Sequence, residues 1–206
     1  MAQSTEVVRL AAQQYRQASE VLGRAFYDDP LTQYVIPDDA RRARLLPSFF
    51  GTAVRYCLRY GEIFTTPDVQ GVACWLPPEN AIPTTARIIG LGLSALPLRL
   101  LPWDLGRALL MENYTGAMHR SVAPVRHWYL WVLGVDPPCQ RRGVGSQLMQ
   151  PILTRADAEG TSCYLETEKE VNVPFYQRHG FKVMREGKMP RSNVHVWAML
   201  RAPGAQ

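Results

Sequence analysis

The stretch WYLWVLGVDPPCQRRGVGSQLMQ, Trp128 to Gln150, carries most of the information about this chain. It opens with an uninterrupted apolar run, Trp128 to Val135, whose β-branched and aromatic residues are typical of a buried strand. Asp136 and two prolines end that strand, because proline has no N–H to donate to a sheet. An amphipathic helix is predicted to follow over Gln147 to Glu159.

The turn between this strand and this helix contains two glycines and two arginines. Backbone N–H groups at a helix N-terminus have no intrahelical partner, and the helix dipole adds partial positive charge there. Such a turn is an anion site, and its glycines let the backbone approach a pyrophosphate closely. The predicted pyrophosphate-binding residues are Gln140, Arg141, Arg142, Gly143, Val144, Gly145 and Ser146. The pattern is not Walker A, because no Gly-Lys-Ser/Thr follows a first glycine after a four-residue gap. It is not the Rossmann fingerprint either, since Leu148 stands where a third glycine or alanine is required.

A second motif lies downstream, from Tyr164 to Val183, and reads YLETEKEVNVPFYQRHGFKV. A strand ending Leu-Glu-Thr is followed there by N-x-P-F-Y-x-x-x-G-F. The first stretch contains Gln/Arg-x-x-Gly-x-Gly/Ala after V-D-P. These two motifs, in this order, resemble those of the GNAT N-acetyltransferases. The resemblance extends from Val7 to the C-terminal WAMLRAPGA. Within the superfamily the chain is most similar to the puromycin N-acetyltransferase type.

The resemblance implies an α/β fold with a central mixed sheet of about seven strands, splayed in the middle and flanked by helices. We expect a single domain over residues 1–206, with an acceptor-side half (7–127) and an acetyl-CoA-binding and catalytic half (128–200). It also implies direct transfer of an acetyl group from acetyl-CoA to the primary amine of a small molecule. The alternatives are a protein lysine or N-terminal amine as acceptor, and a catalytically weak acyl-CoA-binding module.

Roles for individual residues follow from the same resemblance. Leu133, Gly134 and Val135 are expected to contact the acetyl group and the pantetheine arm through their main chain. Asn172 is expected to hydrogen-bond that arm, with helix capping as its alternative role. Tyr176 is the candidate general acid for the departing thiolate, because a phenol with a pKa near ~10 is a suitable proton source.

Acidic residues are the candidates for handling the amine. Glu166 ends its predicted strand where the acceptor is expected, and it serves there as general base or ammonium ligand unless it is a surface or capping residue. Asp28 and Asp29 either line the acceptor pocket or only terminate the first helix. No base is paired with Cys139, which favours direct transfer over an acyl-cysteine intermediate.

Composition excludes several other classes of protein. The net charge is +5, but basic residues are scattered among acidic ones, so no nucleic-acid groove is predicted. The four cysteines have neither metal-ligand nor disulfide spacing, so no metal site is expected. The most apolar window, Ala81 to Trp103, is interrupted by arginines and prolines and is not expected to span a membrane. We therefore expect a cytoplasmic enzyme, either monomer or homodimer, and antibiotic resistance is one role compatible with the puromycin-type resemblance.

Periodicity and turn residues predict the remaining elements. The strands are expected at 7–10, 62–66, 72–76, 163–166, 181–185 and 194–200. The helices are expected at 13–28, from Asp38 or Asp39 to Gly61, at 84–96, at 104–119 and at 173–179. Pro47 is placed in the first turn of a continuation of the second helix. The segment from Ala81 to Ala117 shows little resemblance to the puromycin-type enzymes, and segments of this kind are expected to shape the acceptor pocket.

Overall fold

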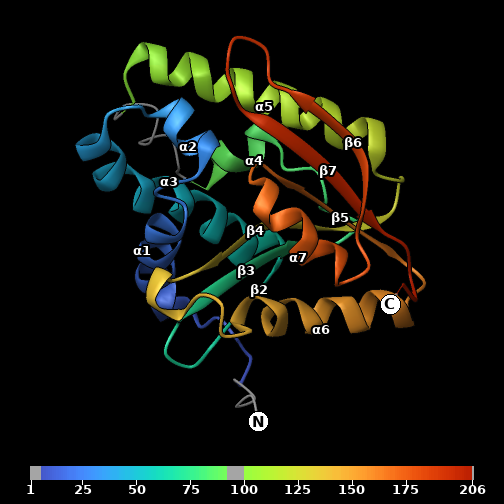
Figure 1. The fold of residues 1–206 in the computed structure, drawn as a ribbon. Helices are drawn as coiled ribbons and strands as arrows, with labels where there is room; N and C mark the ends of the chain where they lie inside the picture. The colour runs from blue at the N-terminus through green and yellow to red at the C-terminus, as the bar shows by residue number, and fades with distance from the viewer. Residues whose placement is uncertain (1–5, 92–99, 206) are drawn as a thin grey trace.

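A computed structural model of the chain describes residues 6–91 and 100–205, and it contains a seven-stranded mixed sheet between helices (Figure 1). The strand order is β1-β2-β3-β4-β5-β7-β6. All neighbouring strands run antiparallel except β4 and β5, which are parallel. The strands are β1 Val8–Arg9, β2 Glu62–Thr65, β3 Gly71–Leu76, β4 His127–Val135, β5 Ser162–Thr167, β6 Lys182–Lys188 and β7 His195–Arg201. The predicted fold class is confirmed.

The helices follow the predicted order, with additional short elements. They are α1 Tyr15–Ala25, α2 Pro30–Val35, α3 Asp39–Tyr60, α4 Thr85–Gly90, α5 Pro102–Val122, α6 Val144–Ala158 and α7 Val173–Gln177. Short 3-10 turns lie at η1 Ala12–Gln14, η3 Pro137–Cys139 and η4 Glu170–Asn172. The predicted helix at 84–96 lies only partly within the described residues.

Two helix predictions in the N-terminal third were wrong in detail. The predicted helix 13–28 ends at Ala25, and a separate helix begins at Pro30. Asp29 caps this second helix, because its Oδ1 accepts a hydrogen bond from the Leu31 N–H at 2.9 Å. Pro47 lies inside one continuous helix, α3, rather than at the start of a new one. Its ring faces Gly23 of α1, where a Cβ would come within 3.0 Å of the ring, so the glycine lets the two helices approach closely.

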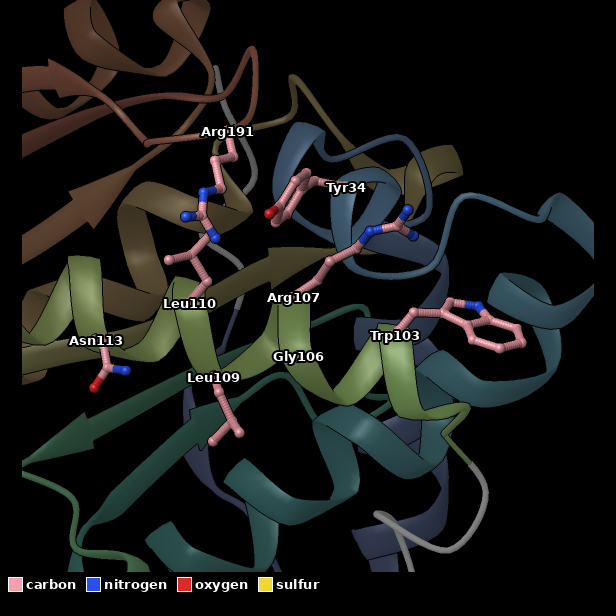
Figure 2. Close-up of a pocket in the computed structure, with 8 residues that line it drawn as sticks. All are labelled: Tyr34, Trp103, Gly106, Arg107, Leu109, Leu110, Asn113 and Arg191. Atoms are coloured by element: carbon pink, nitrogen blue, oxygen red, sulfur yellow. The ribbon is translucent and has the colours of Figure 1, made fainter.

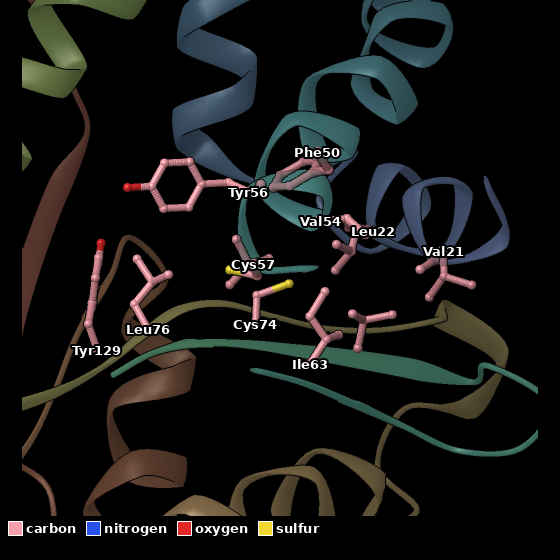
Figure 3. Close-up of a cluster of buried hydrophobic side chains, with 14 of the residues drawn as sticks. Val21, Leu22, Phe50, Val54, Tyr56, Cys57, Ile63, Cys74, Leu76 and Tyr129 are labelled. Atoms are coloured by element: carbon pink, nitrogen blue, oxygen red, sulfur yellow. The ribbon is translucent and has the colours of Figure 1, made fainter. Parts of the chain in front are cut away.

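Helices cover both faces of the sheet. On one face, α1, α3 and α5 pack on a cluster that includes Leu22, Val54 and Cys74 (Figure 3). On the other face, α6 and α7 pack on a second cluster that includes Leu148 and Phe181. We call these the α3 face and the α6 face. Each strand therefore presents one set of side chains to each helical layer, as expected for period-2 alternation.

The feature that positions the site is a separation of β4 from β5. Only three residue pairs join these strands, and the last is Tyr129 with Tyr164. Beyond it, β4 stays paired with β3 as far as Val135, and β5 stays paired with β7 as far as Thr167. Trp131 is skipped in the β3–β4 register, which marks a bulge in β4 just past the last pair. The sheet is thus splayed in its middle, as the sequence resemblance predicts.

Candidate active site

The opening between β4 and β5 joins the two faces of the sheet. Tyr164 and Glu166 are two residues apart on β5, so both side chains point to the α3 face. The Tyr164 hydroxyl donates a hydrogen bond to Glu166 Oε1 at 2.9 Å. The Tyr129 hydroxyl also faces this carboxylate and favours its ionised form. Glu166 therefore lies two residues beyond the last pair that joins β4 and β5, at the margin of the opening.

The surroundings of Glu166 set its protonation. Burial raises its pKa to about 7, and the nearby charge of Glu112 on α5 acts in the same direction. Hydrogen bonding from Tyr129 and Tyr164 opposes this rise. A carboxylate with a pKa near neutrality can accept a proton and release it again at physiological pH. The geometry is therefore compatible with the predicted role of general base.

Further carboxylates lie near the opening. Burial raises the pKa of Glu168 well above its usual value, and the charges of Asp29 and Glu166 raise it further. The pKa of Asp29 is also raised by burial, while the Leu31 N–H and Lys169 partly offset the rise. Asp29 thus caps α2 and lies close enough to Glu168 to raise the pKa of that carboxyl, while its place in the acceptor pocket stays a prediction. Asp28 is exposed on the surface beside it.

Tyr176 lies on the opposite, α6 face of the opening. It belongs to α7 and is 7% exposed, with its ring against Phe175 and Phe181. Burial raises its pKa, and the charges of Glu168 and Asp29 raise it further. The phenol therefore keeps its proton at neutral pH, as a general acid must before it donates.

The loop before α6 has the geometry of an anion site. Gly143 caps the helix with a φ of 85°, and Arg141 also has a positive φ of 60°. No side chain caps the first turn, so the N–H groups of Val144 and its neighbours face outward. Gln140 folds back, and its Nε2 donates to the Val135 carbonyl at 3.0 Å. Arg141 and Arg142 are exposed beside this turn.

The end of β4 leads from this loop toward Glu166. Leu133 and Val135 pack toward the α6 face, while Gly134 faces α1. A Cβ on Gly134 would lie 2.7 Å from Leu22 Cδ2, so any other residue there would require the Leu22 side chain or α1 to shift. After Tyr129, the β4 edge that faces β5 has no strand partner in the described chain, and its main-chain groups are free to bind another extended group. Asn172 Nδ2 donates to Thr167 Oγ1 at 3.2 Å and does not cap α7.

The sequence did not single out the groups that surround Glu166. The sequence pattern predicts Tyr129 and Tyr164 only as strand residues. The i, i+2 spacing of Tyr164 and Glu166 nevertheless indicates that their side chains share one face of the strand. His119 and His127 join the same cluster, with their Nε2 atoms 2.7 Å apart and the His119 ring stacked on Tyr164. The second ring nitrogen of His127 lies 2.7 Å from the Pro124 carbonyl and must donate to it, so His119 donates to His127.

Two clefts flank this part of the molecule, and neither is lined by Tyr176 or Glu166. One, of about 430 Å³, lies between α2, α5 and the loop carrying Arg191; in Figure 2 the Tyr34 hydroxyl and the Arg191 guanidinium point into it. The other, of about 480 Å³, has His119 and His127 among its lining residues. Residues of the segment Glu79–His127 line both clefts.

Comparison with known proteins agrees with the fold. Residues 104–181 match the Acetyltransferase (GNAT) family. The chain is 27% identical to an uncharacterised N-acetyltransferase of Schizosaccharomyces pombe over 95% of this chain and 82% of that protein. A Corynebacterium glutamicum structure described as histone acetyltransferase HPA2 and related acetyltransferase superposes with a TM-score of 0.66 at 20% identity, covering 98% of each chain. Arylalkylamine N-acetyltransferase 2 of Aedes aegypti gives a TM-score of 0.62 at 13% identity, covering 98% of this chain and 100% of that one.

Residues 104–181 are thus similar to the Acetyltransferase (GNAT) family, and the fungal relative and the splayed sheet agree with that likeness. The acceptor is a separate question, because the two structural relatives carry names that refer to different kinds of amine. None of the proteins described here is a puromycin acetyltransferase, so that finer resemblance stays a prediction. Within the described residues, no helix is long and apolar enough to cross a membrane.

Proposed function

We propose that the protein transfers the acetyl group of acetyl-CoA directly to the primary amine of a small molecule at the opening between β4 and β5. The observation that carries this proposal is the separation of the two proton-handling groups. Glu166 lies on the α3 face of the sheet, and Tyr176 lies on the α6 face. An acceptor on the first face and a thioester on the second would meet at the opening.

Acetyl-CoA fits the α6 face on two grounds. The uncapped N-terminus of α6, with Arg141 and Arg142 beside it, suits a pyrophosphate. The unpaired edge of β4 offers main-chain groups to an extended pantetheine arm, from Val135 back toward the bulge at Trp131. Asn172 is close enough to the end of β5 to contribute a further hydrogen bond.

In the proposed reaction, the carboxylates attract the acceptor as an ammonium ion, and Glu166 removes one proton. The freed lone pair attacks the thioester carbonyl, so a C–N bond forms. A backbone N–H of β4 stabilises the oxyanion. Collapse of the tetrahedral intermediate breaks the C–S bond, and Tyr176 donates its proton to the leaving thiolate. The nitrogen loses its second proton to solvent as the amide forms. The products are the amide and free CoA, after which Glu166 and Tyr176 exchange protons with solvent.

The arrangement of α5 supports a small acceptor rather than a protein chain. This helix packs against α2 and against β7, so it bridges the acceptor side of the sheet. In Figure 1 it runs along β6 and β7. An extended peptide would need an open groove at this position.

The test is thiol release from acetyl-CoA by the purified protein with a panel of amines. The panel contains puromycin, aminoglycosides, polyamines, arylalkylamines, amino acids and a histone-tail peptide. We expect release with one class of small amine and none with the peptide. Release with the peptide alone would contradict the small-molecule acceptor.

A further inference from the structure

Tyr56 carries a buried hydroxyl that has no hydrogen-bond partner in the described part of the chain. The residue lies on α3 and is fully buried. Buried polar groups are ordinarily hydrogen-bonded, so an orphan of this kind indicates a missing ligand or water. Tyr15, on the neighbouring helix, differs: its hydroxyl accepts from Arg55 at 3.3 Å.

The position of the Tyr56 ring connects it to the opening in the sheet. It meets Trp131 edge-on, with ring centroids 5.4 Å apart and an interplanar angle of 80°. Trp131 is the half-buried bulge residue of β4, two positions beyond the last residue paired with β5. Tyr56 is therefore packed against the strand at the point where the opening begins.

The hydroxyl is directed out of the aliphatic core. In Figure 3, the hydroxyls of Tyr56 and Tyr129 both leave the cluster on the same side, away from Val21 and Leu22. Tyr129 faces Glu166 at that side. Both tyrosines belong to the cluster on the α3 face, where the amine is proposed to bind.

We propose that Tyr56 is an acceptor-binding residue whose hydroxyl oxygen accepts a hydrogen bond from the primary ammonium group of the substrate. The inference rests on the proposed function and names a residue that selects the acceptor. An ammonium has three N–H donors, so a phenol oxygen adds an acceptor to those of the Glu166 carboxylate. The Tyr56 and Trp131 rings also form an aromatic wall that favours a cation on a hydrocarbon arm. The expected substrate class is a primary alkylamine or arylalkylamine.

The experiment compares Tyr56→Phe with Tyr15→Phe and wild type, using the best amine from the panel. Each substitution removes one hydroxyl and keeps the ring. For Tyr56→Phe we expect KM for the amine to rise about tenfold, the loss of one hydrogen bond, while KM for acetyl-CoA stays unchanged. Its melting temperature should equal or exceed that of the wild type, because the variant no longer buries an unpaired hydroxyl. Tyr15→Phe should leave both KM values unchanged.

Other outcomes separate this inference from the proposed function. An active wild type with an unchanged amine KM in Tyr56→Phe would overturn the role of Tyr56 alone, and would mean that water satisfies the hydroxyl. A lowered melting temperature with both KM values altered would also overturn it, since that pattern indicates a structural role. Absence of acetyl transfer by the wild type to any amine would overturn the proposed function, and this inference with it.

Discussion

The ionisation of Glu166 leads to a specific pH dependence. Its pKa is raised to about 7, so about a tenth of the protein carries the ionised base at pH 6 and about nine-tenths at pH 8. If this carboxylate takes the proton from the bound ammonium, kcat/KM should increase tenfold per pH unit below pH ~6. It should level off above pH ~8 and stay constant until the free amine loses its own proton.

Glu166→Gln removes the base and leaves a side chain of similar size. Activity then requires an amine that arrives already neutral, so kcat/KM should rise with slope one through pH 7 without a break. At pH 7 the variant should be slower by roughly 10²- to 10⁴-fold, the usual contribution of a general base. The difference should narrow as the pH approaches the pKa of the amine. The assay is thiol release at subsaturating amine from pH 5.5 to 9.5.

A matched control is Glu170→Gln, which removes an exposed carboxylate in the same segment. Its pH profile should follow that of the wild type. The reasoning is refuted if Glu166→Gln keeps the break near pH 7, because another group then titrates there. It is also refuted if the wild type shows no break between pH 6 and 8.

Three further predictions concern stability and cofactor binding. Gly143→Ala should destabilise the fold by about 1–2 kcal/mol and raise KM for acetyl-CoA. The cause is the φ of 85°, which strains a residue that has a Cβ even though no atom lies within 4 Å of that position. An unchanged KM would mean that this turn does not bind acetyl-CoA. Gly134→Ala should lower the free energy of unfolding by about 1–3 kcal/mol, measured by chemical denaturation, because its Cβ would lie 2.7 Å from Leu22 of α1. An unchanged free energy of unfolding would mean that α1 shifts to accommodate the methyl group without cost. The pKa of His119 is lowered to about 3, mainly by burial and further by the charge of His127, so the imidazole is neutral in the folded protein. The unfolded chain takes up a proton at this residue below pH ~6.5, so the folded state loses stability as the pH falls. From pH 7.5 to 5.0 the free energy of unfolding should fall by roughly 2 kcal/mol more in the wild type than in His119→Gln, and equal decreases would contradict the assignment.

Local signals in the sequence predicted the elements that we propose to bind acetyl-CoA. The apolar run of β4, its two prolines and the glycine turn are contiguous, so their geometry depends on neighbours in sequence. Gly143 has the positive φ that such a turn requires. The splay between β4 and β5 was predicted from the resemblance, and the register of the two strands confirms it.

Non-local packing determined what the sequence did not predict. Tyr129 meets Glu166 only because β4 and β5 are parallel neighbours, which no periodicity within either segment reveals. Glu112 reaches the same carboxylate from α5, inside the segment that shows little resemblance to the puromycin-type enzymes. The unpaired hydroxyl of Tyr56 is also a tertiary property, because α3 periodicity indicates only a buried aromatic residue. The division of α1 from α2 was missed where one capping aspartate outweighed a continuous helical pattern.

The central claim is that Tyr176 supplies the proton to the thiolate that leaves at the opening of the sheet. The most direct measurement is the single-turnover rate of acetyl transfer by Tyr176→Phe, with acetyl-CoA affinity determined separately by calorimetry. We predict a rate reduced by about 10²-fold or more with acetyl-CoA affinity unchanged, because phenylalanine keeps the packing against Phe175 and Phe181 but has no proton to give. A variant that transfers acetyl at the wild-type rate would contradict the account.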